Sequence, residues 1–90
     1  MDLARRFGAN LNAARRASGL SQERLAFRAG LHRTEIGLLE HGRRIPRIDT
    51  VAKLARAMEI GPGELLVGLE ITEQELARSR RQILSNLSQS

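Results

Sequence analysis

The side chains best suited to catalysis or metal binding are few in this 90-residue chain. It contains no cysteine and no tyrosine, and its imidazoles are those of His32 and His41. Two histidines nine residues apart, without a cluster of carboxylates, do not form a metal site. Glu73 and Glu75 fall at an expected helix start, where the helix dipole favours acidic side chains. No glycine loop of the Walker type occurs. We therefore expect no catalytic residue, no metal and no cofactor.

Arginine offers a different chemistry, the binding of a polyanion. Residues 1–47 carry ten arginines and four carboxylates, a net charge of +6, whereas residues 48–70 carry −2 and residues 71–90 carry +1. Guanidinium groups make paired hydrogen bonds to phosphate and to guanine. The charge distribution therefore indicates a nucleic-acid partner for the N-terminal half. An ordinary solvated, arginine-rich surface is the alternative.

The basic half contains two short helices joined by a tight turn, a helix-turn-helix. Ser21 can cap the first helix through its hydroxyl group, and Gly30 suits the left-handed residue that follows its end. The second helix is expected over about residues 32–41, with Gly42 ending it. Helices this short are marginal alone in water. They are expected to pack through Leu25, Ala26, Ala29, Ile36 and Leu39.

Further helices are expected on both sides of this pair. One covers residues 2–18, where Gly8 costs roughly 1 kcal/mol relative to alanine, and its apolar stripe is Leu3, Phe7, Leu11 and Ala14. Another follows the loop at Pro46 and is ended by Gly61; its apolar side is Ile48, Val51, Leu54, Ala55 and Met58. A short helix, PGELLV, then adds Leu65 and Leu66 to the core.

Two charged residues fall beside the expected core, Arg15 four residues after Leu11 and Glu40 four residues after Ile36. A buried carboxylate needs a partner, because an unpaired buried charge is costly. We therefore predict an Arg15–Glu40 ion pair with a structural role, joining the first helix to the third.

After residue 68 the five-helix pattern ends, and a sixth helix is expected over about residues 72–87. Thr72 and Glu75 have the spacing of a capping box. The apolar stripe of this helix consists of Leu76, Ile83, Leu84 and Leu87. Through this stripe the helix could fold back on the domain, or pack on a second copy of the chain or on another protein. We thus expect an all-α chain with a five-helix domain over residues 1–68 and a helical extension over residues 69–90.

The segments SQERLAFRAGLHRTEIGLLEHG, RRIPRIDTVAKLARAMEI and GPGELL resemble the Cro and phage-repressor class of helix-turn-helix domains, often called XRE-like. The resemblance covers about residues 6–67. The residues at the spacing of the family are Gln22, Ala26, Gly30, Ile36, Glu40, Gly42 and Pro46. The resemblance implies a five-helix fold and sequence-specific binding of double-stranded DNA, as a homodimer on a palindromic operator.

In that family the second helix of the motif enters the major groove, and its base-reading positions fall here on His32, Arg33, Thr34 and Leu38. Arg33 suits paired bonds to guanine, or a phosphate contact. Thr34 could offer its methyl group to thymine or its hydroxyl group to phosphate. Leu38 could contact a thymine methyl group or be an ordinary exposed leucine. His32 stands where the family has a serine or threonine cap, so that capping and base contact are both open.

The family's phosphate-binding glutamine corresponds to Gln22, at the start of the first helix of the motif. Further phosphate contacts are expected from Arg43, Arg44, Arg47 and Arg16, each with a solvated surface charge as the alternative. Phe27 departs from the polar residue of the family and is expected to be exposed, where it covers an apolar edge or contacts another chain.

Three functional hypotheses follow for this chain. The first is a prokaryotic or phage transcription regulator, a repressor that binds DNA as a homodimer. The second is an antitoxin-like DNA-binding protein whose C-terminal helix holds a partner protein. The third is a domain of this fold that serves assembly and has lost DNA binding, which Gln22 and the arginines at 33, 43 and 44 disfavour. No apolar run reaches the ~20 residues of a membrane span, and we expect a cytoplasmic, nucleoid-associated protein.

Overall fold

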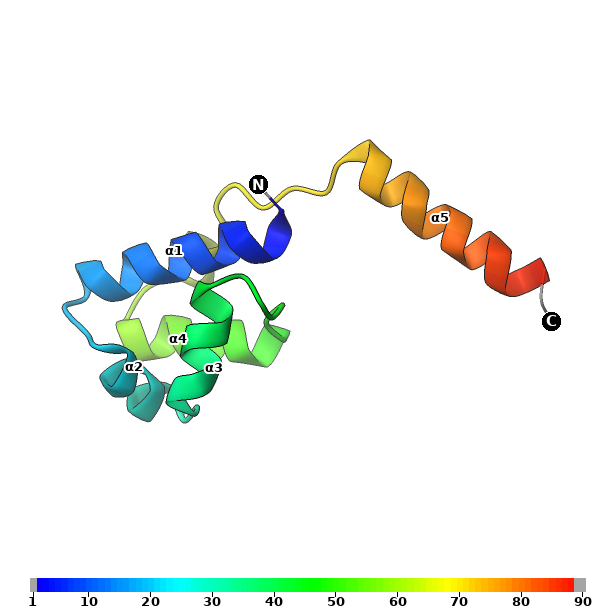
Figure 1. The fold of residues 1–90 in the computed structure, drawn as a ribbon. Helices are drawn as coiled ribbons and strands as arrows, with labels where there is room; N and C mark the ends of the chain where they lie inside the picture. The colour runs from blue at the N-terminus through cyan, green and yellow to red at the C-terminus, as the bar shows by residue number, and fades with distance from the viewer. Residues whose placement is uncertain (1, 89–90) are drawn as a thin grey trace.

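The computed structural model describes residues 2–88, and all regular structure among them is helical. The elements are α1 (Leu3–Ala17), α2 (Gln22–Ala29), α3 (Arg33–Glu40), α4 (Ile48–Met58), the 3-10 helix η1 (Pro62–Leu66) and α5 (Glu73–Ser88). The first five pack together, and α5 extends away from them (Figure 1), so that the molecule measures 50 × 24 × 20 Å. The predicted all-α class is confirmed, with a 3-10 helix as the fifth element. No helix in the described range is long and apolar enough to cross a membrane.

Short-range hydrogen bonds decide where the helices begin and end. The side-chain oxygens of Asp2 and Ser21 accept bonds from the N–H groups of Arg5 and Arg24, at 2.8 and 3.0 Å, and so cap α1 and α2. Each of α1–α4 then ends on a left-handed residue, whose successor bonds back to the carbonyl group five residues earlier. The left-handed residues are Gly19, Gly30, Gly42 and Glu59.

The end of α4 differs from the prediction, because its left-handed residue is Glu59 (φ 58°) and not Gly61. The Ile60 N–H group bonds to the Ala55 carbonyl oxygen at 3.0 Å, and the Ile60 side chain packs against the core. That apolar contact is the usual companion of this helix end. Gly61 instead has extended backbone and precedes η1.

One apolar core joins α1–α4 and η1. Its buried members are Phe7, Leu11, Leu25, Ala26, Ala29, Ile36, Leu39, Val51, Leu54, Ala55, Ala57, Met58 and Leu65. Two predicted core residues are wrong: Ile48 is 90% exposed and Leu66 is 43% exposed. Ile48 is the first residue of α4, where the helix has not yet come over the core. Both side chains instead line a shallow apolar groove of about 250 Å³, together with Leu3, Ala4, Phe7, Ile45, Pro46, Val51 and Leu69.

Two residues of α1, Gly8 and Asn10, contact α3 and the end of η1. Neither contact was predicted from the helical pattern. Gly8 is buried where α1 meets the end of α3; a Cβ atom there would lie 2.5 Å from the Leu39 carbonyl oxygen and 2.6 Å from that of Glu40. Asn10 donates from Nδ2 to the carbonyl oxygens of Leu65 and Val67, at 3.0 and 2.8 Å. These contacts fix α1 on α3 and on the end of η1.

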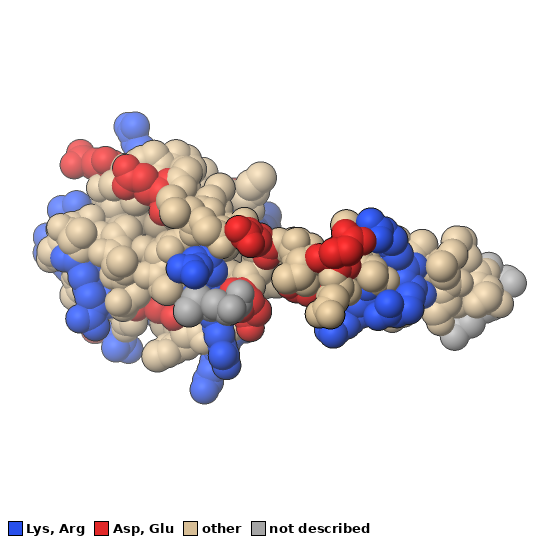
Figure 2. All heavy atoms as spheres, turned by 90° about the horizontal axis from the view of Figure 1, so that it is seen from above, with Lys and Arg blue, Asp and Glu red and all other residues tan. Residues whose placement is uncertain are grey.

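Helix α5 begins with the predicted capping box. The Glu75 N–H group donates to Thr72 Oγ1 at 3.0 Å, and the Thr72 N–H group donates to Glu75 Oε1 at 3.3 Å. Acidic side chains lie where α5 begins and arginine side chains lie along its middle (Figure 2). The predicted stripe is 42–65% exposed, and no described residue of α5 is buried. Of the three expected arrangements, folding back on the domain is therefore not the one found.

Candidate nucleic-acid interface

Helix α3 has one buried side and one exposed side. Ile36 and Leu39 are completely buried and attach the helix to the core, as predicted. Three of the four predicted base-contacting residues are exposed at its start: His32, Arg33 and Thr34. The fourth, Leu38, is half-buried. The start of α3 thus offers polar and cationic side chains to solvent while its apolar side is held rigidly.

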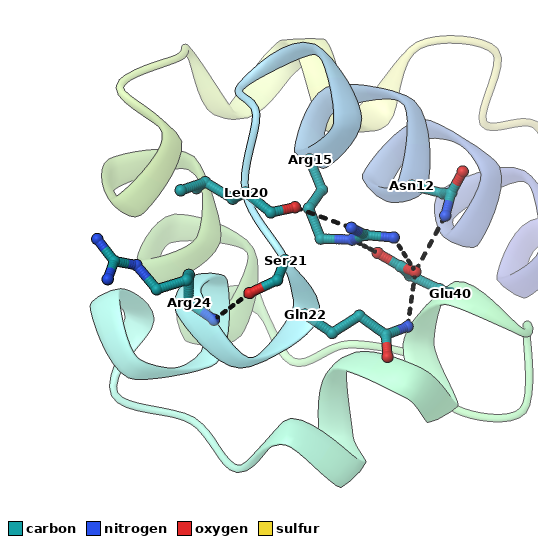
Figure 3. Close-up of polar contacts among 7 residues, drawn as sticks. All are labelled: Asn12, Arg15, Leu20, Ser21, Gln22, Arg24 and Glu40. Atoms are coloured by element: carbon teal, nitrogen blue, oxygen red, sulfur yellow. Dashed lines mark hydrogen bonds and ion pairs between the residues drawn. The ribbon is translucent and has the colours of Figure 1, made fainter.

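The predicted Arg15–Glu40 ion pair is present and nearly buried (Figure 3). Arg15 Nε lies 2.6 Å from Glu40 Oε2 and Arg15 Nη2 lies 3.2 Å from Glu40 Oε1. The two side chains are 12% and 4% exposed. Arg15 Nη1 also donates to the Leu20 carbonyl oxygen at 2.9 Å. The guanidinium group therefore binds both the end of α3 and the turn before α2.

Two amides complete the coordination of the Glu40 carboxylate. Asn12 Nδ2 and Gln22 Nε2 both donate to Glu40 Oε1, at 3.1 and 3.0 Å. Burial by itself would raise the pKa of Glu40, but the hydrogen bonds from Arg15, Gln22 and Asn12 outweigh burial, and the pKa lies below its ordinary value. The hydrogen bond to Glu40 raises the pKa of Arg15. Both groups are therefore charged at neutral pH.

Gln22, a predicted phosphate contact, has a hydrogen-bond partner within the protein that was not predicted from the sequence. It is the first residue of α2, immediately after the capping Ser21, and its side chain is half-buried. Figure 3 shows its amide nitrogen turned toward Glu40. The side chain is thus tied to the end of α3 before any ligand arrives.

The next residue, Glu23, contacts the other end of α3. Its Oε1 lies 3.9 Å from Arg33 Nε, and the side chains of the pair are 80% and 64% exposed. Such exposed pairs stabilise a fold by at most about 1 kcal/mol. The geometric result is that the first two residues of α2 contact opposite ends of α3.

Of the two roles left open for His32, capping of α3 is not found. His32 has the extended backbone of a capping residue, but its side chain makes no capping hydrogen bond. An imidazole has neither the short reach nor the oxygen acceptor of serine or threonine, which satisfy the free N–H groups of a first turn. The side chain is exposed, so base contact is the surviving alternative.

The remaining predicted phosphate contacts are exposed arginines on two segments, α1 and the loop between α3 and α4. Arg43 and Arg44 follow the end of α3, Arg16 lies in the last turn of α1, and Arg47 precedes α4. Arg47 Nε is 3.2 Å from Asp49 Oδ1, an exposed pair. Phe27 is 87% exposed, as predicted, and no contact in the described chain explains it.

The α2–turn–α3 unit, packed by α1, α4 and η1, defines a helix-turn-helix DNA-binding domain, and comparison with known proteins agrees. A family model described as helix-turn-helix matches residues 11–65. The HTH-type transcriptional regulator y4dJ of Sinorhizobium fredii is 35% identical over 72 residues, which are 80% of this chain and 94% of that protein. Control protein C.BamHI of Bacillus amyloliquefaciens is 43% identical over 49 residues, 54% of this chain and 60% of that protein.

A solved structure extends the agreement to three dimensions. The crystal structure of the restriction-modification controller protein C.AhdI from Aeromonas hydrophila is 45% identical, with a TM-score of 0.67 over 69% of this chain and 94% of that chain. The present chain belongs to the helix-turn-helix family of sequence-specific DNA-binding transcription regulators.

Proposed function

We propose that this protein is a repressor that binds a palindromic operator as a homodimer, with α3 in the major groove. The observation that carries the proposal is the two-sided α3: Ile36 and Leu39 fix the helix, while His32, Arg33 and Thr34 are exposed at its start. In a recognition helix the N-terminal residues contact base edges. The proposed activity is binding alone, without a catalytic step, and a DNA partner would keep the protein at the nucleoid of the cytoplasm.

Each exposed residue of α3 has a proposed role. Arg33 would donate two bonds to O6 and N7 of a guanine, the commonest specific contact of arginine. Leu38, half-buried and one helical turn after Thr34, would contact a thymine methyl group. His32 and Thr34 would contact neighbouring base edges. Glu23 would release Arg33 readily, because their pair is long and solvated.

The phosphate contacts would hold the domain in register along the groove. Gln22 would bind one phosphate at the start of α2, and Arg43 and Arg44 would bind others beyond the end of α3. Arg47 and Arg16 are the outer candidates. Because these contacts release counterions from the DNA, affinity should fall steeply with salt.

Selection of bound sequences from random DNA tests the proposal directly. We expect an enriched palindrome whose half-sites lie about one helical turn apart, roughly 10–10.5 base pairs between centres. A family of bound duplexes without any shared sequence would contradict base reading by α3. A single, non-repeated motif would contradict the homodimer while leaving the groove assignment intact.

Two alanine variants separate base reading from backbone binding. Arg33→Ala should lose preference at one base position, at a loss of about 1–3 kcal/mol of binding free energy on the selected site. Gln22→Ala should weaken all sequences alike. Arg56→Ala, an exposed arginine of α4 outside the proposed surface, is the matched control and should bind like the wild type. Fluorescence anisotropy on the selected site and its single-base variants measures all three; unchanged affinity for both test variants would refute the assigned groove.

We further propose that residues 69–90 form a dimerisation extension of the domain at residues 1–68. Helix α5 projects from the domain (Figure 1). The side chains of Leu76, Ile83 and Leu84 are between 42% and 64% exposed, and Leu87 belongs to the same stripe. An isolated 16-residue helix is marginal in water, so that a packing partner would stabilise it. The named relatives are a transcriptional regulator and controller proteins, which favours a second copy over a toxin-like partner.

Truncation tests this extension. The shortened chain should keep residues 1–70, because Leu69 packs against the core and Val67 accepts a bond from Asn10. We expect a folded monomer by light scattering at concentrations where the full chain is a dimer. A matched full-length variant, Ile83→Glu with Leu84→Glu, should behave in the same way. Dimers that survive truncation would move the interface to the groove beside Ile45, Ile48 and Leu66. A different protein that co-purifies in stoichiometric amount from the native host would favour the antitoxin-like alternative.

A further inference from the structure

We propose that Glu40 is a positioning residue for DNA binding: its carboxylate orients the Gln22 amide so that the second amide N–H group donates to a DNA phosphate. The inference rests on the proposed function and gives the buried Glu40 network a role beyond stability. The carrying observation is the 3.0 Å bond from Gln22 Nε2 to Glu40 Oε1, which joins the first residue of α2 to the last residue of α3.

The chemistry of the two groups determines which way the amide faces. An ionised carboxylate only accepts hydrogen bonds, whereas an amide has an accepting oxygen and a nitrogen that donates two. The Gln22 nitrogen must therefore face Glu40, as it does in Figure 3. The opposite orientation would bring two oxygens together and would leave the Gln22 amide without a bond to Glu40. In the observed orientation one N–H group is used by Glu40, and the second remains on a side chain that solvent reaches.

Arg15 makes a carboxylate acceptable in this position. A negative charge near a DNA phosphate would weaken binding, but the guanidinium group lies 2.6 Å from Glu40 Oε2 and balances that charge. Glu40 therefore acts as a strong hydrogen-bond acceptor in a pair that carries no net charge. A free glutamine at the start of α2 would lack this constraint and would lose side-chain freedom on binding.

The network also links phosphate binding to the reading helix. Asn12 and Arg15 come from α1, Gln22 begins α2 and Glu40 ends α3, and the first three side chains all donate to the Glu40 carboxylate (Figure 3). A phosphate held by Gln22 would thus be held at a fixed distance from the exposed residues of α3. The positions of backbone contact and base contact would be set by the same rigid unit.

The test removes the carboxylate without leaving a buried charge unpaired. Arg15→Met combined with Glu40→Leu replaces the pair by apolar side chains, an exchange that folded proteins often tolerate. On the selected duplex, with folding checked by circular dichroism, we expect affinity to fall about fivefold to tenfold, the cost of ordering one free side chain. In a Gln22→Ala background the same double replacement should change affinity less than twofold. The loss should likewise vanish on a duplex whose contacted phosphate is a neutral methylphosphonate.

Asn10→Ala is the matched control, because it removes amide hydrogen bonds from α1 to the Leu65 and Val67 carbonyl oxygens, outside the Glu40 network, and Asn10 is not a predicted DNA contact. It should bind DNA within twofold of the wild type. An equal loss from the double replacement with and without Gln22 would show a merely structural role and overturn the proposal. A wild-type chain that binds no selected DNA would instead refute the proposed function itself.

A measurement on the unaltered protein keeps the proposal testable if the double replacement does not fold. In NMR spectra the two Gln22 amide protons should be inequivalent: one protected by Glu40 and unchanged by DNA, the other shifted when the operator is added. Loss of the protected proton in the complex would overturn the proposal.

Discussion

Replacing Arg15 with alanine is expected to lower the free energy of unfolding by about 3–5 kcal/mol, the usual result of leaving a buried charge without its partner. The Glu40 side chain is 4% exposed and would keep only the bonds from Asn12 and Gln22. A domain of this size has about 5–15 kcal/mol of stability in total. Thermal unfolding followed by circular dichroism should therefore show a fall in Tm of roughly 12 °C or more.

Arg16→Ala is the matched control for this variant, because it removes an exposed arginine from the adjacent position of α1. Its stability should stay within about 0.5 kcal/mol of the wild type. If the two variants unfold alike, the Arg15–Glu40 pair does not stabilise the fold.

The Arg15–Glu40 pair also predicts how the stability difference between the wild type and Arg15→Ala depends on pH. Because folding lowers the pKa of Glu40, its contribution is fully present above the ordinary value of 4.5 and is lost as the pH falls through the lower, folded-state value. In the Arg15→Ala protein that lowering is largely absent. The stability difference between wild type and variant should therefore be largest near neutral pH and should shrink in acid. A difference that grows on acidification would contradict this assignment.

Gly8→Ala is expected to destabilise the fold by about 2 kcal/mol, although alanine is the better helix former. The new Cβ atom would lie 2.5 and 2.6 Å from two backbone carbonyl oxygens at the end of α3. Backbone atoms cannot rotate away, so that α1 and α3 would have to separate. Overpacking costs about 1–3 kcal/mol, and the upper end applies here because both clashing atoms belong to the backbone. The ~1 kcal/mol that alanine contributes to a helix then leaves a net loss of about 2 kcal/mol. Urea unfolding measures the change.

Gly37→Ala is the opposite case and serves as the control. Gly37 lies within α3, and a Cβ atom there would meet nothing within 4 Å. Alanine should therefore stabilise this helix by about 0.5–1 kcal/mol. If both glycine replacements stabilise the protein, the close crossing of α1 and α3 is not present in solution.

The groove at the start of α4 illustrates a limit of helical patterns. Ile48 lies three residues before Val51, and the pattern therefore places both on one side of α4. The structure buries Val51 and leaves Ile48 90% exposed, because no other element covers the first turn of α4. A pattern of apolar residues identifies a side of a helix but not how far along that side the neighbours extend.

The exposure of single residues in the candidate site could be predicted from the sequence. The hydrogen bonds between site residues far apart in the sequence could not. The exposure of Thr34 follows from its place opposite Ile36, and the exposure of His32 and Arg33 follows from their place at the start of α3. The connection of Gln22 to Glu40 does not, because 18 residues separate them and an amide has many possible partners. Asn10 and Asn12 gave only a weak signal: asparagine is a poor helix former, and two of them inside α1 suggest tertiary contacts.

The sequence by itself determined what depends on neighbours within three to five residues: the caps at Ser21 and Thr72, the left-handed turn at Gly30 and the helical periods. It also determined the Arg15–Glu40 pair, because a buried charge must find a partner. Only the tertiary structure decided that Gly8 permits the approach of α3, that Gln22 is bound before DNA arrives, and that α5 leaves the domain. These features depend on the distance between helices and on their direction, which arise from packing the whole core and not from any single segment.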